Sequence, residues 1–370
     1  MSSCRSLAGQ QAVARPKDPP AALPKTHYSA MSRCRLWPRH PARGPDDHLG
    51  AVCDGQANDD GRPAWWASGR ACEILAGGFH GSDCADQLPV VHGGPCARSK
   101  NCTVQFLARC NSGAGTMSLI VSLIARKGGS SKTTTALNLA GAALDDDAGT
   151  VLLVDLDSQA SLSKALLGPE VVFGLRPDQT VQAVADRSRT AGDVVRETRV
   201  PGLLLLPSYP DLRVPADAVL NLAGVDPTVT IIDTCPDIRD TAVRCALLTS
   251  HAAVSPVVPE SWGLQSVAEV QTLLMGTGIV SNDRLLFAGW LLSMVQRASM
   301  HTICSHTLRR LHGSMVFDTV VPHAVSFKEA CAAGVPVTHH APKSGAAKVA
   351  RAVYGELCQR IAKSLERGAA

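Results

Sequence analysis

The chain has 370 residues, of which 45% are hydrophobic and 18% charged, and its formal net charge is +4. A chain of this length can hold two or three domains and bury a sizeable core. No apolar run approaches the roughly 20 residues that a membrane-spanning helix needs, and no compact apolar segment precedes a small-residue cleavage site at the N-terminus. Composition therefore excludes a protein with a membrane span and predicts a globular, cytoplasmic one.

The first 116 residues differ in kind from the rest of the chain. They contain 13 Lys and Arg against 9 Asp and Glu, whereas residues 117–370 contain 23 of each, so the net charge belongs to the front segment. Pro, Gly, Trp and Cys are scattered there without a helical or alternating apolar period. We predict that residues 1–116 are an extension of no recognisable fold, either disordered or preceding a functional start at Met117. A genuine appended module is the rival interpretation.

The front segment also holds eight of the 13 cysteines. None of them forms a Cys-x-x-Cys pair, which disfavours a zinc site, with His80 and His92 as loose candidate ligands. A disulfide framework would conflict with a cytosolic protein.

From Met117 the pattern becomes regular. Residues 118–124 form an apolar run typical of a buried strand, and they lead directly into the glycine-rich loop RKGGSSKTT at residues 126–134. Further strand-like runs alternate with helical patterns at residues 151–156, 203–206, 229–233, 252–258, 285–294 and 315–321. This alternation predicts an α/β fold in which a doubly wound, mostly parallel sheet forms one P-loop NTPase domain over residues 117–370.

The glycine-rich loop is a candidate phosphate-binding loop. Glycines allow backbone N–H groups to close around phosphate oxygens, and the helix that begins near Lys132 directs its positive end at them. Lys132 is expected to meet the β and γ phosphates of ATP, and Thr133 is placed to give its hydroxyl to Mg²⁺. The expected nucleotide-binding set in this loop is Lys127, Gly128, Gly129, Ser130, Ser131, Lys132, Thr133 and Thr134.

Ser131 departs from the usual loop, because the residue before the P-loop lysine is normally glycine. If this position requires a positive φ, a side chain costs on the order of 1 kcal/mol. We therefore expect Ser131 to weaken nucleotide binding without abolishing it.

Several motifs together resemble one family, the ParA-type partition ATPases. Residues 127–134 look like the deviant, two-lysine Walker A motif of that family. The sequence LLVDLDSQ at residues 152–159 is similar to its second acidic motif, and IIDTCP at residues 231–236 resembles its Walker B motif. The segments PVVPE at residues 256–260 and VPH at residues 321–323 are similar to its later signatures, so the likeness covers essentially all of residues 117–370.

This resemblance implies a homodimer that forms with ATP, in which Lys127 reaches the phosphates held by the partner subunit. Asp157 would orient or activate the attacking water, and two carboxylates at Asp155 and Asp157 point to the same face of an extended chain. Asp233 would hold Mg²⁺, with Asp155 as a second acidic candidate. Pro322 stands where the family contacts the adenine base.

The resemblance also implies non-specific DNA binding, stimulation by a ParB-like adaptor, and a cytoplasmic protein associated with the nucleoid. Two basic stretches, at residues 296–316 and 330–355, lack Asp and Glu and are suited to contacting DNA phosphates. The candidate DNA-binding residues are Arg297, Arg309, Arg310, Lys343, Lys348 and Arg351.

Two alternatives to a plasmid or chromosome partition ATPase stay open. A MinD-like positioning ATPase would bind membrane through its last helix, but the apolar stripe at Val349, Val353, Leu357 and Ile361 is more typical of core packing. A weakly hydrolysing ParA-like DNA-binding regulator is the other alternative, because of Ser131. A metal or electron carrier is disfavoured, since the cysteines after residue 117 show no paired spacing.

Overall fold

The computed structural model describes residues 118–275, 282 and 285–368. The extension predicted for residues 1–116, and Met117 with it, lie outside the described residues. Within the described part the chain forms a seven-stranded sheet in the order β3-β4-β2-β5-β1-β6-β7. The strands are β1 (Leu119–Leu123), β2 (Val151–Leu156), β3 (Arg196–Glu197), β4 (Leu203–Leu206), β5 (Val229–Thr234), β6 (Ala252–Val257) and β7 (Leu286–Leu292).

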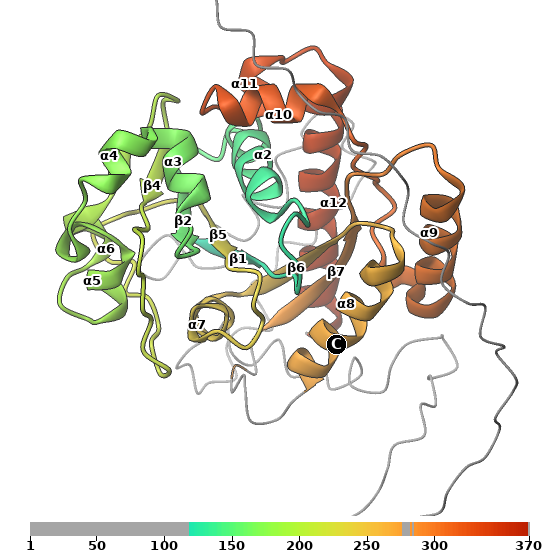
Figure 1. Cartoon of the computed structure of the whole chain (residues 1–370), viewed down its shortest axis with the longest axis horizontal. Coiled ribbons are helices and arrows are strands. Elements are labelled where there is room, and N and C mark those ends of the chain that lie inside the picture. Colours follow the sequence, from blue (N-terminus) through green and yellow to red (C-terminus); the bar gives the residue numbers. More distant parts are fainter. Residues whose placement is uncertain (1–117, 276–281, 283–284, 369–370) are drawn as a thin grey trace, which may run out of the picture. The chain divides into compact units, whose positions relative to one another are not determined.

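The sheet is parallel throughout except at one edge, where β3 pairs antiparallel with β4. The central strands β2 and β5 are buried along their whole length, as expected when helices cover both faces. Figure 1 shows β1, β2 and β5 in the middle of the molecule, with β7 toward the side of α8 and α9. The predicted doubly wound α/β fold is therefore confirmed.

Helices pack on both faces of this sheet and enclose two apolar clusters. One cluster joins the sheet to α7, α8 and α9, and the other joins it to α2 and α12. The helices are α2 (Lys132–Asp145), α3 (Ser161–Leu167), α4 (Pro169–Phe173), α5 (Val181–Ala185), α6 (Ala191–Val194), α7 (Thr241–Thr249), α8 (Ser261–Met275), α9 (Ser299–His312), α10 (Val325–Ala332), α11 (Val337–His340) and α12 (Gly345–Gly368). Short 3₁₀ turns lie at Pro177–Gln179 and Gly313–Met315.

The apolar stripe on the last helix lies in the core. Val353, Leu357 and Ile361 are buried, and Val349 packs against the same cluster, which joins α12 to α2 and the sheet. This confirms that the stripe serves core packing. No helix among the described residues is long and apolar enough to cross a membrane.

The prediction of a strand at residues 315–321 was wrong. The segment follows the edge of β7 but makes only isolated bridges, from Trp290 to Val316 and from Val295 to Pro322. Between these bridges the backbone N–H groups of Asp318 and Thr319 donate to the carboxylate of Glu356, so a side chain takes the place of a neighbouring strand. The two-residue strand β3 was missed, because both of its residues are exposed and carry no apolar pattern.

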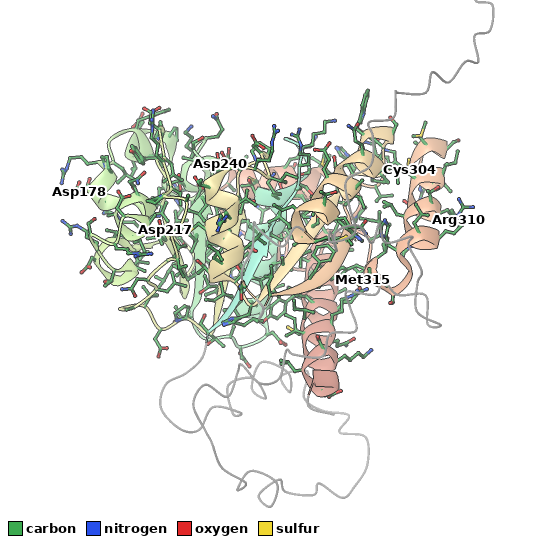
Figure 2. The ribbon with its side chains drawn as sticks, turned by 90° about the horizontal axis from the view of Figure 1, so that it is seen from below. Asp178, Asp217, Asp240, Cys304, Arg310 and Met315 are labelled. Carbon is green, nitrogen blue, oxygen red and sulfur yellow. The ribbon has the colours of Figure 1, made fainter. Side chains whose placement is uncertain are left out.

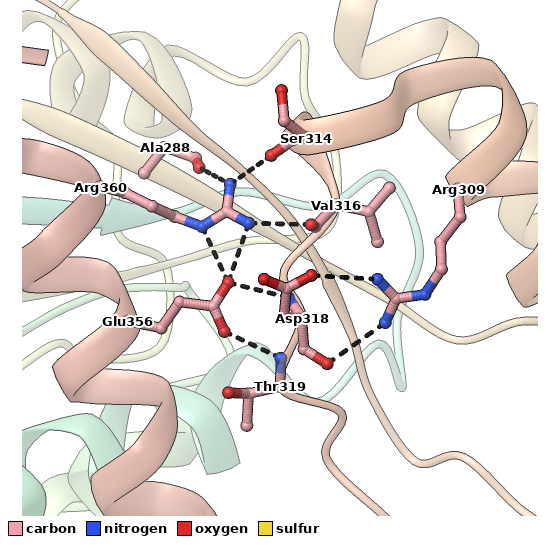
Figure 3. Close-up of polar contacts among 8 residues, drawn as sticks. All are labelled: Ala288, Arg309, Ser314, Val316, Asp318, Thr319, Glu356 and Arg360. Carbon is pink, nitrogen blue, oxygen red and sulfur yellow. Dashed lines mark hydrogen bonds and ion pairs between the residues drawn. The ribbon is translucent and has the colours of Figure 1, made fainter. Parts of the chain in front are cut away.

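An arginine on α12 secures this edge segment, as Figure 3 shows. The Arg360 guanidinium donates to the carbonyl oxygens of Ala288, Ser314 and Val316 and to the carboxylate of Glu356. Both side chains of the Arg360–Glu356 pair are largely buried, with 18% and 14% exposed. The anchored segment leads directly to Pro322 and so fixes where that residue meets the glycine-rich loop.

Candidate functional site

The glycine-rich loop joins the end of β1 to the start of α2. Ser131 has φ 66° and ψ 19°, in the left-handed region, and Gly129 has φ 76°. This confirms the positive φ considered for Ser131 from sequence, and a strain on the order of 1 kcal/mol is the expected cost. A Cβ atom built on Gly128 or Gly129 would meet nothing within 4 Å, so the loop borders open space into which their backbone faces.

Polar atoms in and below this loop lack hydrogen-bond partners. Among the described residues, the buried atoms without a partner include the hydroxyl oxygens of Ser130 and Ser131 and one carboxylate oxygen of Asp233. No side chain caps the first turn of α2 either. Buried polar groups are normally satisfied, so these atoms, together with an uncapped helix N-terminus, fit a phosphate-bearing ligand with its cation.

Lys132 is the buried cation of the loop, with 7% of its surface exposed. Its Nζ donates to the carbonyl oxygen of Ala125 over 3.4 Å, a long hydrogen bond. Burial lowers its pKa, and the nearby carboxylates of Asp233 and Asp157 act in the opposite direction. A desolvated ammonium with one weak hydrogen bond is well suited to receive phosphate oxygens.

A hydrogen bond joins Thr133, at the start of α2, to Asp233, near the carboxyl end of the central strand β5. The Thr133 hydroxyl donates to Oδ2 of Asp233 over 2.6 Å, and Asp233 lies near the end of β5 with no exposed surface. Burial, followed by the charge of Asp155, raises the pKa of Asp233 to about 8. Without a cation, these surroundings therefore favour the protonated form of the Asp233 carboxyl. A bound Mg²⁺ would favour its charged form, so the pair fits a magnesium site.

Asp155 does not fit the metal-ligand role expected from sequence. One of its carboxylate oxygens accepts hydrogen bonds from both the backbone N–H and the hydroxyl of Ser163, and the other accepts from the backbone N–H of Asp157. The residue is fully buried, and burial raises its pKa to about 6. These bonds tie the end of β2 to α3, and we assign Asp155 to positioning the loop that carries Asp157.

Asp157 is half-buried, directly after β2. Its Oδ1 accepts from the backbone N–H of Gln159, and its charge acts on Lys132. The expectation that Asp155 and Asp157 share one face is thus replaced by a division of roles, because the chain leaves the extended conformation after Leu156.

Pro322 meets the glycine-rich loop in a pocket of about 240 Å³. The pocket also has Gly129, Ser131 and Thr134 in its wall, so the residue expected at the adenine base lies beside the residues expected at the phosphates. Met294 and Phe327 belong to the apolar lining, and sequence analysis missed them because each lacks a motif.

Lys127 is exposed, and its ammonium lies 5.4 Å from the centre of the Trp262 ring on α8. Trp262 is itself 60% exposed. A cation–π contact of this kind contributes about 0.5–1 kcal/mol at an exposed site. Lys127 thus differs from the buried Lys132, and its position leaves it accessible to a second molecule. Sequence analysis missed Trp262, although its place just after PVVPE marks it as the start of a helix beside the loop.

The six candidate DNA-binding residues fall into two groups. Arg309 pairs with Asp318, and Arg351 pairs with Asp145 while donating to the carbonyl oxygen of Pro342. The other four, which are exposed and have no ion-pair partner among the described residues, are Arg297, Arg310, Lys343 and Lys348. Figure 2 shows Arg310 on the outer side of α9. Acidic side chains from outside the two basic stretches thus pair with one arginine of each stretch.

The described residues contain no group of three or more His, Cys, Asp or Glu side chains that could hold a metal ion by themselves. The five cysteines in this part of the chain are all free.

Comparisons with known proteins agree with this arrangement. Residues 121–337 match the CobQ/CobB/MinD/ParA nucleotide-binding domain family. The chromosome-partitioning ATPase Soj of Thermus thermophilus is 32% identical over 254 residues, which cover 65% of this chain and 96% of that protein. An uncharacterized protein of Mycobacterium tuberculosis is 29% identical over 283 residues, covering 72% and 82%. The structure of the septum site-determining protein MinD of Pyrococcus horikoshii with Mg-ADP superimposes with a TM-score of 0.53 at 23% identity, covering 67% and 97%.

Proposed function

Because the chain belongs to the CobQ/CobB/MinD/ParA nucleotide-binding family, we propose that it is a dimerising ATPase for plasmid or chromosome partition. The observation that carries the proposal is the convergence of Lys132, Thr133 and Asp233 at the uncapped start of α2. Two relatives, the chromosome-partitioning ATPase Soj of Thermus thermophilus and the chromosome partitioning protein ParA of Caulobacter vibrioides, support this role.

ATP and Mg²⁺ are the proposed ligands of this site. Backbone N–H groups of residues 128–133, with Lys132, would hold the phosphates, and Pro322 would contact the base. Thr133 and Asp233 would hold the magnesium ion, Asp233 through water. The ion would neutralise charge on the phosphate oxygens, so that water would attack the terminal phosphate more readily.

Hydrolysis is proposed to depend on two further residues. Asp157, half-buried beside Lys132, would orient the attacking water. Lys127 is exposed on the outer side of the loop, and in an ATP-bound dimer it would reach the phosphates held by the partner subunit. ATP binding, dimerisation and hydrolysis would thus be linked through one exposed lysine.

The partners proposed for the ATP-bound dimer are non-specific DNA and a ParB-like adaptor that stimulates hydrolysis. Exposed Arg297, Arg310, Lys343 and Lys348 support contacts with DNA phosphates, which carry no sequence information. This activity would place the protein in the cytoplasm on the nucleoid.

Steady-state hydrolysis of ATP by the full chain, with and without duplex DNA, tests this function. We expect Mg²⁺-dependent turnover that DNA or a ParB-like partner stimulates. Asp157→Asn should keep nucleotide affinity within about 2-fold and lower turnover by about 100-fold or more. Nucleotide binding without turnover, even when DNA and the partner are present, would contradict the proposal that the protein is an ATPase.

A weakly hydrolysing DNA-binding regulator is the second candidate, and the left-handed conformation of Ser131 favours it. Strain at this residue would be relieved in any alternative loop conformation, which would weaken the hold on the γ phosphate. A MinD-like membrane-binding ATPase is less well supported, since the apolar stripe of α12 is buried in the core. Binding to anionic vesicles in the presence of ATP would distinguish it.

A further inference from the structure

A second pocket, of about 550 Å³, lies between α3, α4 and α10. Its charged lining residues are all cations: Lys164 from α3, Arg199 from the segment before β4, and Lys328 from α10. These three side chains come from segments far apart in the sequence. No acidic residue belongs to the lining.

The cations of this pocket have free hydrogen-bonding capacity. Arg199 and Lys328 are exposed and make no hydrogen bond or ion pair through their side chains within the described part of the chain. Lys164 donates to the carbonyl oxygen of Gln159 over 2.7 Å and lies 5.1 Å from the centre of the Phe173 ring. An ammonium has three donors, so two remain on Lys164.

The pocket is held in place by a close backbone contact. Gly334, in the turn after α10, has φ 66°, and a Cβ built on it would lie 2.3 Å from the carbonyl oxygen of Ala165 on α3. Only glycine allows α10 and α3 to approach so closely at this point. The three cations therefore converge on a fixed wall between packed helices.

We propose that this pocket binds a phosphate group of the DNA backbone and forms part of the DNA-binding surface. Convergent cations without a carboxylate neighbour repel each other, and an oxyanion offsets that repulsion. α10, which carries Lys328, packs against α11, and the exposed Lys343 and Lys348 follow α11 in the sequence. These further cations in the same part of the chain favour an extended polyanion over a small phosphorylated molecule.

The pocket also adjoins the proposed nucleotide site. Thr134 and Lys328 line both this pocket and the pocket that contains Pro322. A phosphate held by Lys328 on one side would thus act on the wall of the nucleotide pocket on the other. The inference rests on the proposed function, since it assigns residues to the DNA binding proposed there.

The test compares two triple variants of the full chain in a DNA-binding titration. Lys164→Gln, Arg199→Gln and Lys328→Gln together remove the pocket cations. The matched control, Arg176→Gln, Arg187→Gln and Arg189→Gln, removes the same charge from arginines that are paired with Asp178 or Asp217. Figure 2 shows Asp178 at the edge of the molecule. Affinity for a labelled duplex of arbitrary sequence is measured by fluorescence anisotropy with an ATP analogue and Mg²⁺ at several salt concentrations.

We expect the pocket variant to bind DNA about 10-fold or more weakly and to lose about 2 to 3 units from the slope of log affinity against log salt. The control variant should change by less than about 2-fold. Equal loss in both variants, or no loss in the pocket variant, would overturn the proposal while leaving DNA binding itself intact. Absence of DNA binding by the wild type would overturn the proposed function together with the pocket's role.

A second titration, with inorganic pyrophosphate at saturating ATP analogue, separates DNA from a small phosphate ligand. We expect no saturable binding of pyrophosphate below about 1 mM. Tighter binding that disappears in the pocket variant, with DNA affinity unchanged, would assign the pocket to a small phosphorylated molecule instead. Unchanged melting temperatures of both triple variants would show that each one folds.

Discussion

Positively charged side chains meet opposite conditions in two regions of the molecule. One region is the buried part of the glycine-rich loop, and the other is the surface of α9 and α12. Lys132 is desolvated, faces the carboxyls of Asp233 and Asp157, and has only one long hydrogen bond. Arg309 and Arg351 are partly exposed, and they pair with Asp318 and Asp145, which lie 9 and 206 residues away in the sequence. The buried cation is kept for a ligand by its surroundings, whereas these two partly exposed cations pair with acidic side chains that folding brings near. Substitutions should therefore have large, specific effects in the first region and small ones in the second.

Lys132→Ala should produce the largest effect. It removes the only lysine or arginine that is buried among the described residues and leaves bound phosphates without this charge-assisted partner. We expect nucleotide affinity to fall by about 100-fold or more, measured with a fluorescent ATP analogue. Arg310→Ala, at an exposed and unpaired arginine of the described chain, is the control and should leave nucleotide affinity unchanged. Similar losses in both variants would remove the distinction between the two regions.

Asp233 should make stability depend on pH in protein free of nucleotide and Mg²⁺. Its pKa is about 8 in the folded protein against an ordinary value of 3.8, so the folded state holds a proton that the unfolded state releases between these values. The free energy of unfolding should therefore fall as pH rises from about 4 to about 8. Asp155, with a pKa of about 6, contributes the same sign over the lower part of this range.

Thermal unfolding of the wild type and Asp233→Asn at pH 6, 7 and 8 measures the contribution of Asp233 to the pH dependence of stability. The melting temperature of the wild type should decline across the series, and that of the Asn variant should decline less. The lowered pKa of Lys132 acts with the opposite sign at alkaline pH, below 10.5, so measurements above pH 8 are left out of the comparison. Parallel declines in the two proteins would show that Asp233 is charged in the folded state.

Ser131→Gly should give an intermediate effect in the favourable direction. Glycine adopts φ 66° without the steric cost of a side chain, which is on the order of 1 kcal/mol. Nucleotide affinity should rise by up to about 5-fold if the loop is disordered without ligand. Should the loop be ordered in both states, the gain would appear in the melting temperature instead. Unchanged affinity and stability together would show that the loop accepts the serine without strain.

Trp262→Leu should give the smallest effect, and only where Lys127 is present. Loss of the cation–π contact, which contributes about 0.5–1 kcal/mol, frees the Lys127 side chain. ATP turnover should therefore fall by about 2- to 5-fold. ATP turnover is compared for the wild type, both single variants and the double variant with Lys127→Met. The effect of Trp262→Leu should vanish in the Lys127→Met background, and Trp262→Phe should retain turnover near that of the wild type. Equal effects in both backgrounds would assign Trp262 to packing alone.

Sequence predicted the buried region well because its physics is local. The spacing of Lys132, Thr133 and Asp233 fixes one helix start beside one strand end, and a parallel sheet brings these together. The positive φ of Ser131, which its place in the loop raised as a condition, is present in the structure. Asp155 was the exception, because its partner Ser163 lies on the following helix and carries no motif.

The exposed region was harder to predict because its contacts are long-range. Arg351 meets Asp145, which precedes it by 206 residues, and no pattern within residues 330–355 reveals that pair. The pocket of Lys164, Arg199 and Lys328 likewise arises only when α3 and α10 meet at Gly334. The segment expected as a strand at residues 315–321 failed for the same reason, since Glu356 on α12 takes its backbone hydrogen bonds.

The molecular mass of the full chain in solution, measured by light scattering with Mg²⁺ and either ADP or a non-hydrolysable ATP analogue, tests the proposed switch most directly. We predict a monomer with ADP and a dimer with the ATP analogue. Lys127→Met should bind the analogue and stay monomeric. A wild-type protein that remains monomeric with the analogue bound, or that is dimeric with either nucleotide, would contradict the account.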